Sequence, residues 1–207
     1  LGKILLKNKN ILILSDDIYE HVKFDNFKFF TIAQIKKLKD RTLTMNGVSK
    51  AYAMTGWRIG YAAGPKNIIA AIRKIQSQST SNPSSISQAA AVEALNGTQS
   101  FIKKRAKSFS DRRNFVVNYL NSIPGITCLM PKGAFYVFPS CKGLIGKKTK
   151  IKNDTDFVQK LLEKQNVAVV QGSAFGLDGY FRISYATSMK KLKIAMERIK
   201  LFCESLG

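Results

Sequence analysis

Residues 47–60 of the chain read GVSKAYAMTGWRIG, and the rest of the sequence is organised around them. Lys50 lies among small residues, and Arg58 follows eight positions later. A lysine amine attacks carbonyl groups best when its surroundings favour the neutral form, and a nearby arginine has that effect. The guanidinium also offers a planar set of donors that suits a phosphate. The stretch therefore predicts a reactive lysine beside an anion site.

The composition of the 207 residues, 45% hydrophobic and 23% charged, is typical of a globular protein. No apolar run approaches the roughly 18 to 20 residues that a membrane span requires, so we expect no membrane partner. Three widely spaced cysteines and a single histidine argue against a disulfide framework and a metal site, and favour a reducing, cytoplasmic compartment. The chain starts at Leu1 without an initiator methionine, and we expect it to be part of a longer protein.

The formal net charge is +21. A basic chain of this kind could bind nucleic acid, which is the alternative of a different functional class. The basic residues are spread along the whole chain, and the densest run is only residues 103–107 followed by Arg112 and Arg113. This spread favours solvated surfaces over a nucleic-acid partner.

The first half of the chain has the pattern of an α/β fold. The apolar run 11–14 predicts a strand buried on both faces of a parallel sheet, and residues 42–46 predict a strand that ends just before Lys50. In open α/β sheets ligands gather beyond the carboxyl ends of strands, so Asp16 and Tyr19 lie where chemistry is expected. Apolar residues at helical spacing predict a helix over 31–39. A strand is predicted at 59–64, one helix begins at residue 67, and another spans 86–95.

The second half predicts a compact α+β unit. Apolar residues recur at helical spacing from Ile102 to Asn121, with Arg113 interrupting the stripe. Strands are predicted at 133–139, 167–170 and 181–185, and helices at 154–165 and 189–206. The segment 96–98 is the best boundary, which divides the chain into residues 1–97 and 98–207.

The whole chain resembles the carboxy-terminal half of a class I (fold-type I) pyridoxal-phosphate aminotransferase similar to aspartate aminotransferase. The resemblance implies an α/β fold class. Residues 1–97 would be part of the large domain that binds the cofactor, with a mainly parallel sheet and helices. Residues 98–207 would be the smaller α+β domain with its long connecting helix.

The resemblance also assigns the site. Lys50 would be the Schiff-base lysine that holds pyridoxal 5'-phosphate and later moves a proton. Asp16, with Asp17 as the adjacent alternative, would pair with the pyridine nitrogen and keep the ring an electron sink. Tyr19 would donate its hydroxyl to the ring's 3' oxygen, and Arg58 would bind the phosphate.

Arg182 resembles the family's arginine for the substrate α-carboxylate, where a bidentate contact fixes the geometry of the substrate. Gly47 stands where many relatives carry a phosphate-binding serine, so that hydroxyl is absent here. The polar segment 80–85 falls where relatives approach the neighbouring subunit, which implies a homodimer in the full-length form.

The predicted activity is transamination of an amino acid with a 2-oxo acid, with aspartate and 2-oxoglutarate as the leading pair. Prephenate and aromatic aminotransferases are the close alternatives, because most residues that read the substrate side chain belong to the family's amino-terminal half. That half also supplies a glycine-rich phosphate loop and a ring-stacking aromatic. We therefore expect this segment alone not to transaminate, and a catalytically dead remnant is a third hypothesis.

Overall fold

The structure, a computed structural model, describes residues 1–206 and divides into two compact units, Leu1–Lys104 (unit 1) and Arg105–Gly207 (unit 2). The division falls within the longest helix, α4 (Ser100–Asn121). The domain boundary that the sequence predicts after residue 97 lies just before this helix, and it stays a prediction.

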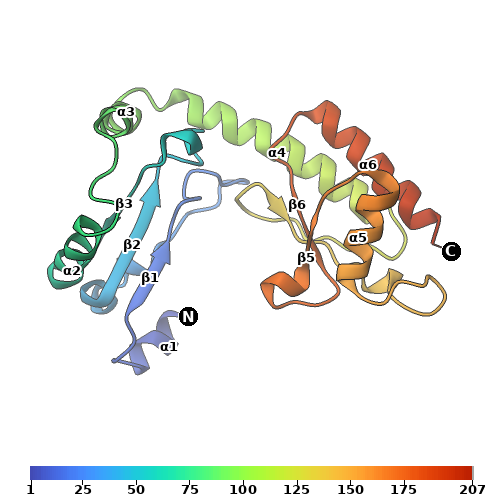
Figure 1. Cartoon of the computed structure of the whole chain (residues 1–207), viewed down its shortest axis with the longest axis horizontal. Coiled ribbons are helices and arrows are strands. Elements are labelled where there is room, and N and C mark those ends of the chain that lie inside the picture. The colour runs from blue at the N-terminus through green and yellow to red at the C-terminus, as the bar shows by residue number, and fades with distance from the viewer. Residues whose placement is uncertain (207) are drawn as a thin grey trace. The chain divides into compact units, whose positions relative to one another are not determined.

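Unit 1 contains a three-stranded sheet in the order β1-β2-β3 (Figure 1). β1 pairs parallel with β2, and β2 pairs antiparallel with β3, so the sheet is mixed rather than mainly parallel. The elements of this unit in chain order are α1 (Gly2–Lys7), β1 (Ile13–Asp16), the 3-10 helices η1 (Ile32–Gln34) and η2 (Lys36–Arg41), β2 (Thr42–Gly47), the 3-10 helix η3 (Thr55–Trp57), β3 (Gly60–Ala63), α2 (Lys66–Ser77) and α3 (Ser85–Asn96).

The strand predicted at 11–14 is displaced to Ile13–Asp16, and the prediction that both its faces are buried is wrong. Leu12 and Leu14 expose 69% and 62% of their surface. Among the described residues β1 pairs only with β2, so it is an edge strand without a second neighbour. The helical spacing over 31–39 forms two short 3-10 helices, η1 and η2, instead of one α-helix.

The core of unit 1 that matters for function is small. Val48, Ala51, Tyr52 and Ala91 are buried together, and apolar side chains from the start of α4 pack against them. Three of these four residues belong to the stretch 47–60, so the turn that carries Lys50 is fixed by burial of its own neighbours.

Unit 2 has the larger core, built around a second three-stranded sheet in the order β4-β6-β5, in which both pairings are antiparallel. Fully buried Phe157, Phe181 and Phe202 bring together α5, β6 and α6 in this core. Its elements are the greater part of α4, then β4 (Tyr136–Val137), the 3-10 helix η4 (Lys142–Leu144), α5 (Asp154–Gln165), β5 (Val170–Gln171), the 3-10 helix η5 (Gly172–Phe175), β6 (Phe181–Ser184) and α6 (Met189–Glu204).

The helices predicted in unit 2 are confirmed, whereas all three strands are shorter than predicted. The strand predicted at 167–170 is the two-residue β5 (Val170–Gln171), and the one predicted at 181–185 ends at Ser184. The segment 133–139 forms strand only at Tyr136–Val137, because Ala134 adopts a left-handed conformation (φ 61°) and Pro139 has no N–H to donate. Arg113, which interrupts the apolar stripe of α4, is buried and donates from Nη1 to the carbonyl oxygen of Pro131 (2.9 Å).

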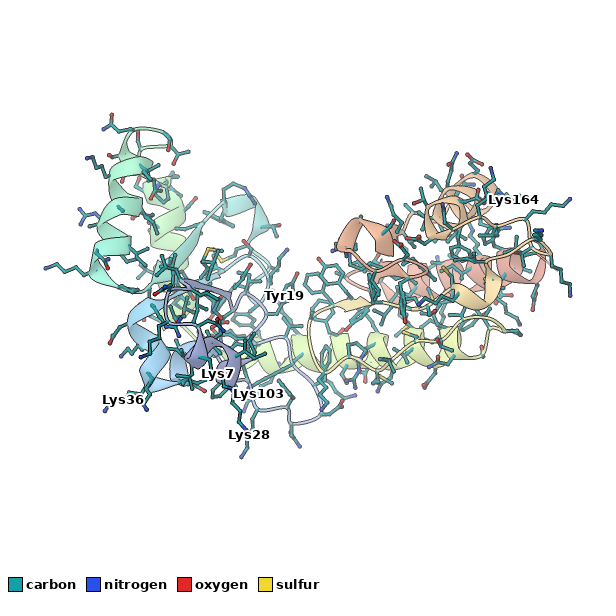
Figure 2. All side chains as sticks on the ribbon, turned by 90° about the horizontal axis from the view of Figure 1, so that it is seen from below. Lys7, Tyr19, Lys28, Lys36, Lys103 and Lys164 are labelled. Carbon is teal, nitrogen blue, oxygen red and sulfur yellow. The ribbon has the colours of Figure 1, made fainter. Side chains whose placement is uncertain are left out.

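The lysines are distributed over both units. Figure 2 labels Lys28 and Lys36 in unit 1 and Lys164 in unit 2, and the three side chains are exposed and extend away from the ribbon. Exposed lysines therefore occur in both units, and the interpretation of the charge as solvated basic surface stays a prediction. None of the helices within residues 1–206 is long and apolar enough to cross a membrane.

Candidate functional site

The predicted site residues of unit 1 share one edge of the sheet. Because β1 and β2 are parallel and Asp16 is in register with Met45, both strands end at the same edge. β3 runs in the opposite direction and starts there, with Gly60 opposite Gly47. The topology thus gathers the segments that carry Tyr19, Lys50 and Arg58 at the end of β1.

Lys50 is half-buried in the turn that follows β2. Its Nζ atom lies 5.9 Å from the centre of the Tyr19 ring, so the two residues are brought together as expected of a common site. Val48 is fully buried and Tyr52 nearly so on either side of Lys50. The hydroxyl of Tyr52 donates to Oε1 of Gln99 (2.9 Å), which fixes the turn further.

The two candidate carboxylates differ in their surroundings. Asp17 is buried, and its Oδ1 accepts a hydrogen bond from the hydroxyl of Ser15 (2.8 Å), while its N–H donates to the carbonyl of Met45 (2.9 Å). Asp16 is exposed, and its Oδ1 accepts from the N–H of Ile18 (3.2 Å). Asp17 therefore serves the local fold, and Asp16 presents the carboxylate that a ligand could reach.

Arg58 adopts a left-handed backbone conformation with φ of 52°. This region is uncommon for residues with a side chain and tends to occur at functional sites. The guanidinium is exposed and its Nη1 donates to the carbonyl of Thr55 (2.8 Å). This contact turns the side chain back over the 3-10 helix η3 and leaves further N–H groups for an anion.

Gly47 and Gly60 let the ends of β2 and β3 approach closely. A Cβ atom on Gly47 would lie 3.2 Å from the Cα of Gly60 and 3.2 Å from the Cδ1 of Ile18. The backbone thus leaves little space for a side chain at position 47, which agrees with a glycine there instead of a serine.

Asn46 and Glu20 were not identified from the sequence, yet they join two segments of this edge. The Nδ2 atom of Asn46 donates to Oε1 of Glu20 (2.7 Å), and Oδ1 of Asn46 accepts from the N–H of Gly47 (2.7 Å). His21 Nε2 lies 3.3 Å from the same Glu20 oxygen. The signal that could have found Asn46 is a polar residue at the end of an alternating strand, four positions before Lys50.

Arg182 belongs to unit 2. It lies on β6, and its guanidinium carbon is 4.6 Å from the centre of the Tyr136 ring and 4.5 Å from that of Phe175. Two aromatic faces thus enclose a half-buried cation.

The groups at the edge of the unit 1 sheet fit pyridoxal phosphate. An amine suits its aldehyde, a carboxylate its ring nitrogen, a phenol its ring oxygen and a guanidinium its phosphate, and Lys50, Asp16, Tyr19 and Arg58 supply one of each. Within residues 1–206 no three histidine, cysteine or acidic side chains are grouped as metal ligands.

The family model described as aminotransferase class I and II matches residues 1–199. The aspartate aminotransferase of Rhizobium meliloti (strain 1021) is 58% identical over 210 residues, which cover 99% of this chain and 51% of the relative. A probable aspartate/prephenate aminotransferase of Rickettsia typhi is 57% identical and covers 100% of this chain and 53% of its own length.

Solved structures agree with these relatives. The crystal structure of the aspartate aminotransferase from Rhizobium meliloti superimposes with a TM-score of 0.94 at 58% identity, covering 98% of this chain and 52% of the other. The aromatic aminotransferase from Pyrococcus horikoshii OT3 gives a TM-score of 0.89 at 36% identity, covering 99% and 54%. The predicted α/β fold class is therefore confirmed, and the chain spans about half the length of the curated relatives it matches. The chain belongs to the class I and II aminotransferases.

Proposed function

We propose that the chain carries the lysine-bearing part of a pyridoxal-phosphate site that transfers the amino group between aspartate and 2-oxoglutarate. The observation that carries the proposal is the position of Lys50, half-buried at a strand end with its Nζ atom 5.9 Å from the Tyr19 ring. The names of the relatives, aspartate aminotransferase among them, support the choice of amino donor.

When bound, pyridoxal phosphate would supply an aldehyde group and a ring that can take up negative charge. Lys50 would hold the aldehyde end through Nζ, and the same amine would serve as the base that moves the proton at the substrate Cα. The carboxylate of Asp16 holds a proton on the ring nitrogen. The hydroxyl of Tyr19 donates to the ring oxygen, and Arg58 binds the phosphate through its in-plane N–H groups.

Arg182 binds the α-carboxylate of the substrate in this proposal. A guanidinium that donates two parallel hydrogen bonds fixes the direction of the bond that must break at Cα as well as the affinity. Arg182 is suited to this role because its planar guanidinium presents paired N–H groups that match the two oxygens of a carboxylate.

The remaining parts of the site come from outside these 207 residues, so the chain alone does not transaminate. The half-length coverage of the relatives supports this view. We also propose a cytoplasmic homodimer for the full-length form, with the segment 80–85 near the neighbouring subunit.

Prephenate is the second candidate substrate, because several relatives from Rickettsia carry the name probable aspartate/prephenate aminotransferase. A comparison of amino donors and acceptors with a full-length form would decide between them. A higher kcat/KM for prephenate than for 2-oxoglutarate would favour this alternative.

The test of the cofactor site uses the purified chain. It is incubated with pyridoxal phosphate, reduced with borohydride and digested, and the cofactor mass is located by mass spectrometry. We expect the label on Lys50, its loss in Lys50→Ala, and its retention in Lys66→Ala, which removes an exposed lysine of the same unit. Equal labelling of many lysines, unaffected by Lys50→Ala, would overturn the proposal.

A further inference from the structure

Arg182 has an unusual set of contacts for a half-buried arginine. Within residues 1–206 its guanidinium forms no ion pair and donates no hydrogen bond. It makes cation–π contacts with the rings of Tyr136 and Phe175. A guanidinium carries five N–H donors that lie in its plane. The two rings cover its faces, and its edge stays available for an acceptor.

The position of Tyr136 follows from the register of the sheet. Tyr136 on β4 is opposite Ser184 on β6, and residues directly opposite in an antiparallel pair point to the same face. Arg182 is two positions from Ser184 and shares that face, whereas Phe181 and Ile183 point into the core. The Tyr136 ring is therefore the diagonal neighbour of Arg182 and lies over its guanidinium.

The position of Phe175 depends on a turn held from several sides. Phe175 ends the 3-10 helix η5, and its ring contacts Phe138 edge-on with centroids 5.9 Å apart. Phe138 is in turn stacked on Tyr180 at 5.6 Å. Gly172, the first residue of η5, donates its N–H to the carbonyl of Tyr180 (2.7 Å), and a Cβ atom at Gly172 would overlap the carbonyl oxygen of Leu177.

Asp154 fixes the same turn from the start of α5. Its carboxylate is almost fully buried, and Oδ2 accepts a hydrogen bond from the N–H of Ser173 (2.8 Å). Ser173 lies two residues before Phe175, so this bond limits the freedom of the ring that covers Arg182. The enclosure of the guanidinium is thus built from β4, β6 and η5, with a buried anchor on α5.

We propose that Tyr136 and Phe175 are positioning residues for Arg182, which keep its guanidinium flat and direct its N–H edge toward a carboxylate. The proposal rests on the carboxylate-binding function proposed for Arg182. A guanidinium held between two π-faces keeps its in-plane donors, and a bidentate carboxylate approaches in that same plane. The rings restrict the rotamers of Arg182, so less conformational entropy is lost when the carboxylate binds.

The test observes Arg182 directly. The side-chain Nε–Hε resonance is followed by NMR in the ¹⁵N-labelled 207-residue chain, assigned by its loss in Arg182→Lys, and titrated with succinate as the carboxylate probe. The variants are Phe175→Leu and Tyr136→Leu, which each remove one ring. Tyr136→Phe keeps the ring, and Leu177→Ala removes an exposed side chain near the same turn without touching Arg182.

In the wild-type chain we expect a ring-shifted Nε–Hε resonance that moves on addition of succinate. Each leucine variant should move the free resonance toward its position in an unfolded peptide and raise the Kd for succinate by about 3- to 10-fold, the range expected for a partly desolvated cation–π contact. Tyr136→Phe and Leu177→Ala should keep both values. The dispersion of the backbone amide resonances reports whether each variant stays folded.

An unchanged resonance and an unchanged Kd in folded Phe175→Leu and Tyr136→Leu would overturn the proposal. If the rings shift the resonance but succinate does not bind the wild-type chain, the rings still position the guanidinium, and it is the carboxylate-binding function proposed for Arg182 that is wrong. The two failures are therefore distinguishable.

Discussion

The Nζ atom of Lys50 lies 5.9 Å from the centre of the Tyr19 ring, although the two residues follow different strands. The parallel pairing of β1 with β2 explains this proximity, because the segments that follow the two strands leave the sheet at the same edge. A ring next to a lysine can also hold a planar ligand in a fixed orientation.

Replacing Tyr19 tests this relationship. In Tyr19→Phe the ring is kept and the hydroxyl is lost, so we expect pyridoxal phosphate to bind about 2- to 10-fold more weakly, as for one lost hydrogen bond. The measurement is the absorbance of the lysine-bound cofactor during titration. Tyr61→Phe removes a hydroxyl from exposed Tyr61 on β3 and should leave the Kd unchanged. Equal affinities of the wild type and Tyr19→Phe would contradict the function proposed for Tyr19.

The close approach of Gly47 to Gly60 predicts a cost for any side chain at position 47. In Gly47→Ala the new Cβ atom would lie 3.2 Å from the Cα of Gly60, which the backbone must accommodate. We expect unfolding free energy to fall by about 1–3 kcal/mol, measured by urea denaturation. Gly56→Ala is the matched control, because no atom lies within 4 Å of a Cβ there, and it should change stability by less than about 1 kcal/mol. A Gly47→Ala variant as stable as Gly56→Ala would refute the steric argument.

The buried carboxylate of Asp154 should make the unfolding free energy of the chain fall in acid. Burial raises the pKa of Asp154, but hydrogen bonds from Ser173, Gly179 and its own N–H outweigh burial and hold the pKa below its usual range. A carboxyl with a lowered folded pKa stabilises the fold fully above its unfolded pKa of about 3.9, and the stabilisation is lost as the pH falls through the folded pKa. The wild type should therefore lose unfolding free energy below about pH 4.5 more steeply than Asp154→Asn.

The comparison is made by urea denaturation over a series of pH values. At pH 7 Asp154→Asn should be less stable by about 1–2 kcal/mol, since hydrogen bonds to a charged acceptor are replaced by neutral ones. Asp178→Asn changes an exposed carboxylate in the same unit and should follow the wild-type curve. Identical pH profiles for the wild type and Asp154→Asn would show that the buried carboxylate contributes nothing to stability.

The three cysteines should be unreactive in the folded chain. Burial raises the pKa of Cys128 to about 11 and the pKa values of Cys141 and Cys203 to about 12, so little thiolate is present near neutral pH. We expect a thiol-specific disulfide reagent at pH 8 to modify none of them until the chain is unfolded in urea, when all three react. Lys164→Cys places a thiol on the exposed face of α5 and should react at once. Rapid reaction of a native cysteine before unfolding would show that unit 2 opens locally.

Sequence patterns were reliable where the deciding interactions are local. α4 and α5 have the predicted extents because apolar residues repeat at helical spacing along each of them. The pattern was misleading at residues 11–14, where an apolar run predicted two buried faces and the structure leaves Leu12 and Leu14 exposed. Burial depends on which elements cover a strand, and an apolar run cannot report that.

The sequence by itself determined which functional groups the candidate site can offer. Lys50 and Arg58 predict a reactive amine beside an anion site because each carries its functional group on one side chain, and the family resemblance assigns Asp16 and Tyr19 to the cofactor ring. Only the tertiary structure decided which of two adjacent carboxylates is exposed, and that Arg182 lies between two rings. Those properties arise from strand register and from contacts between residues far apart in the chain, which no local pattern records.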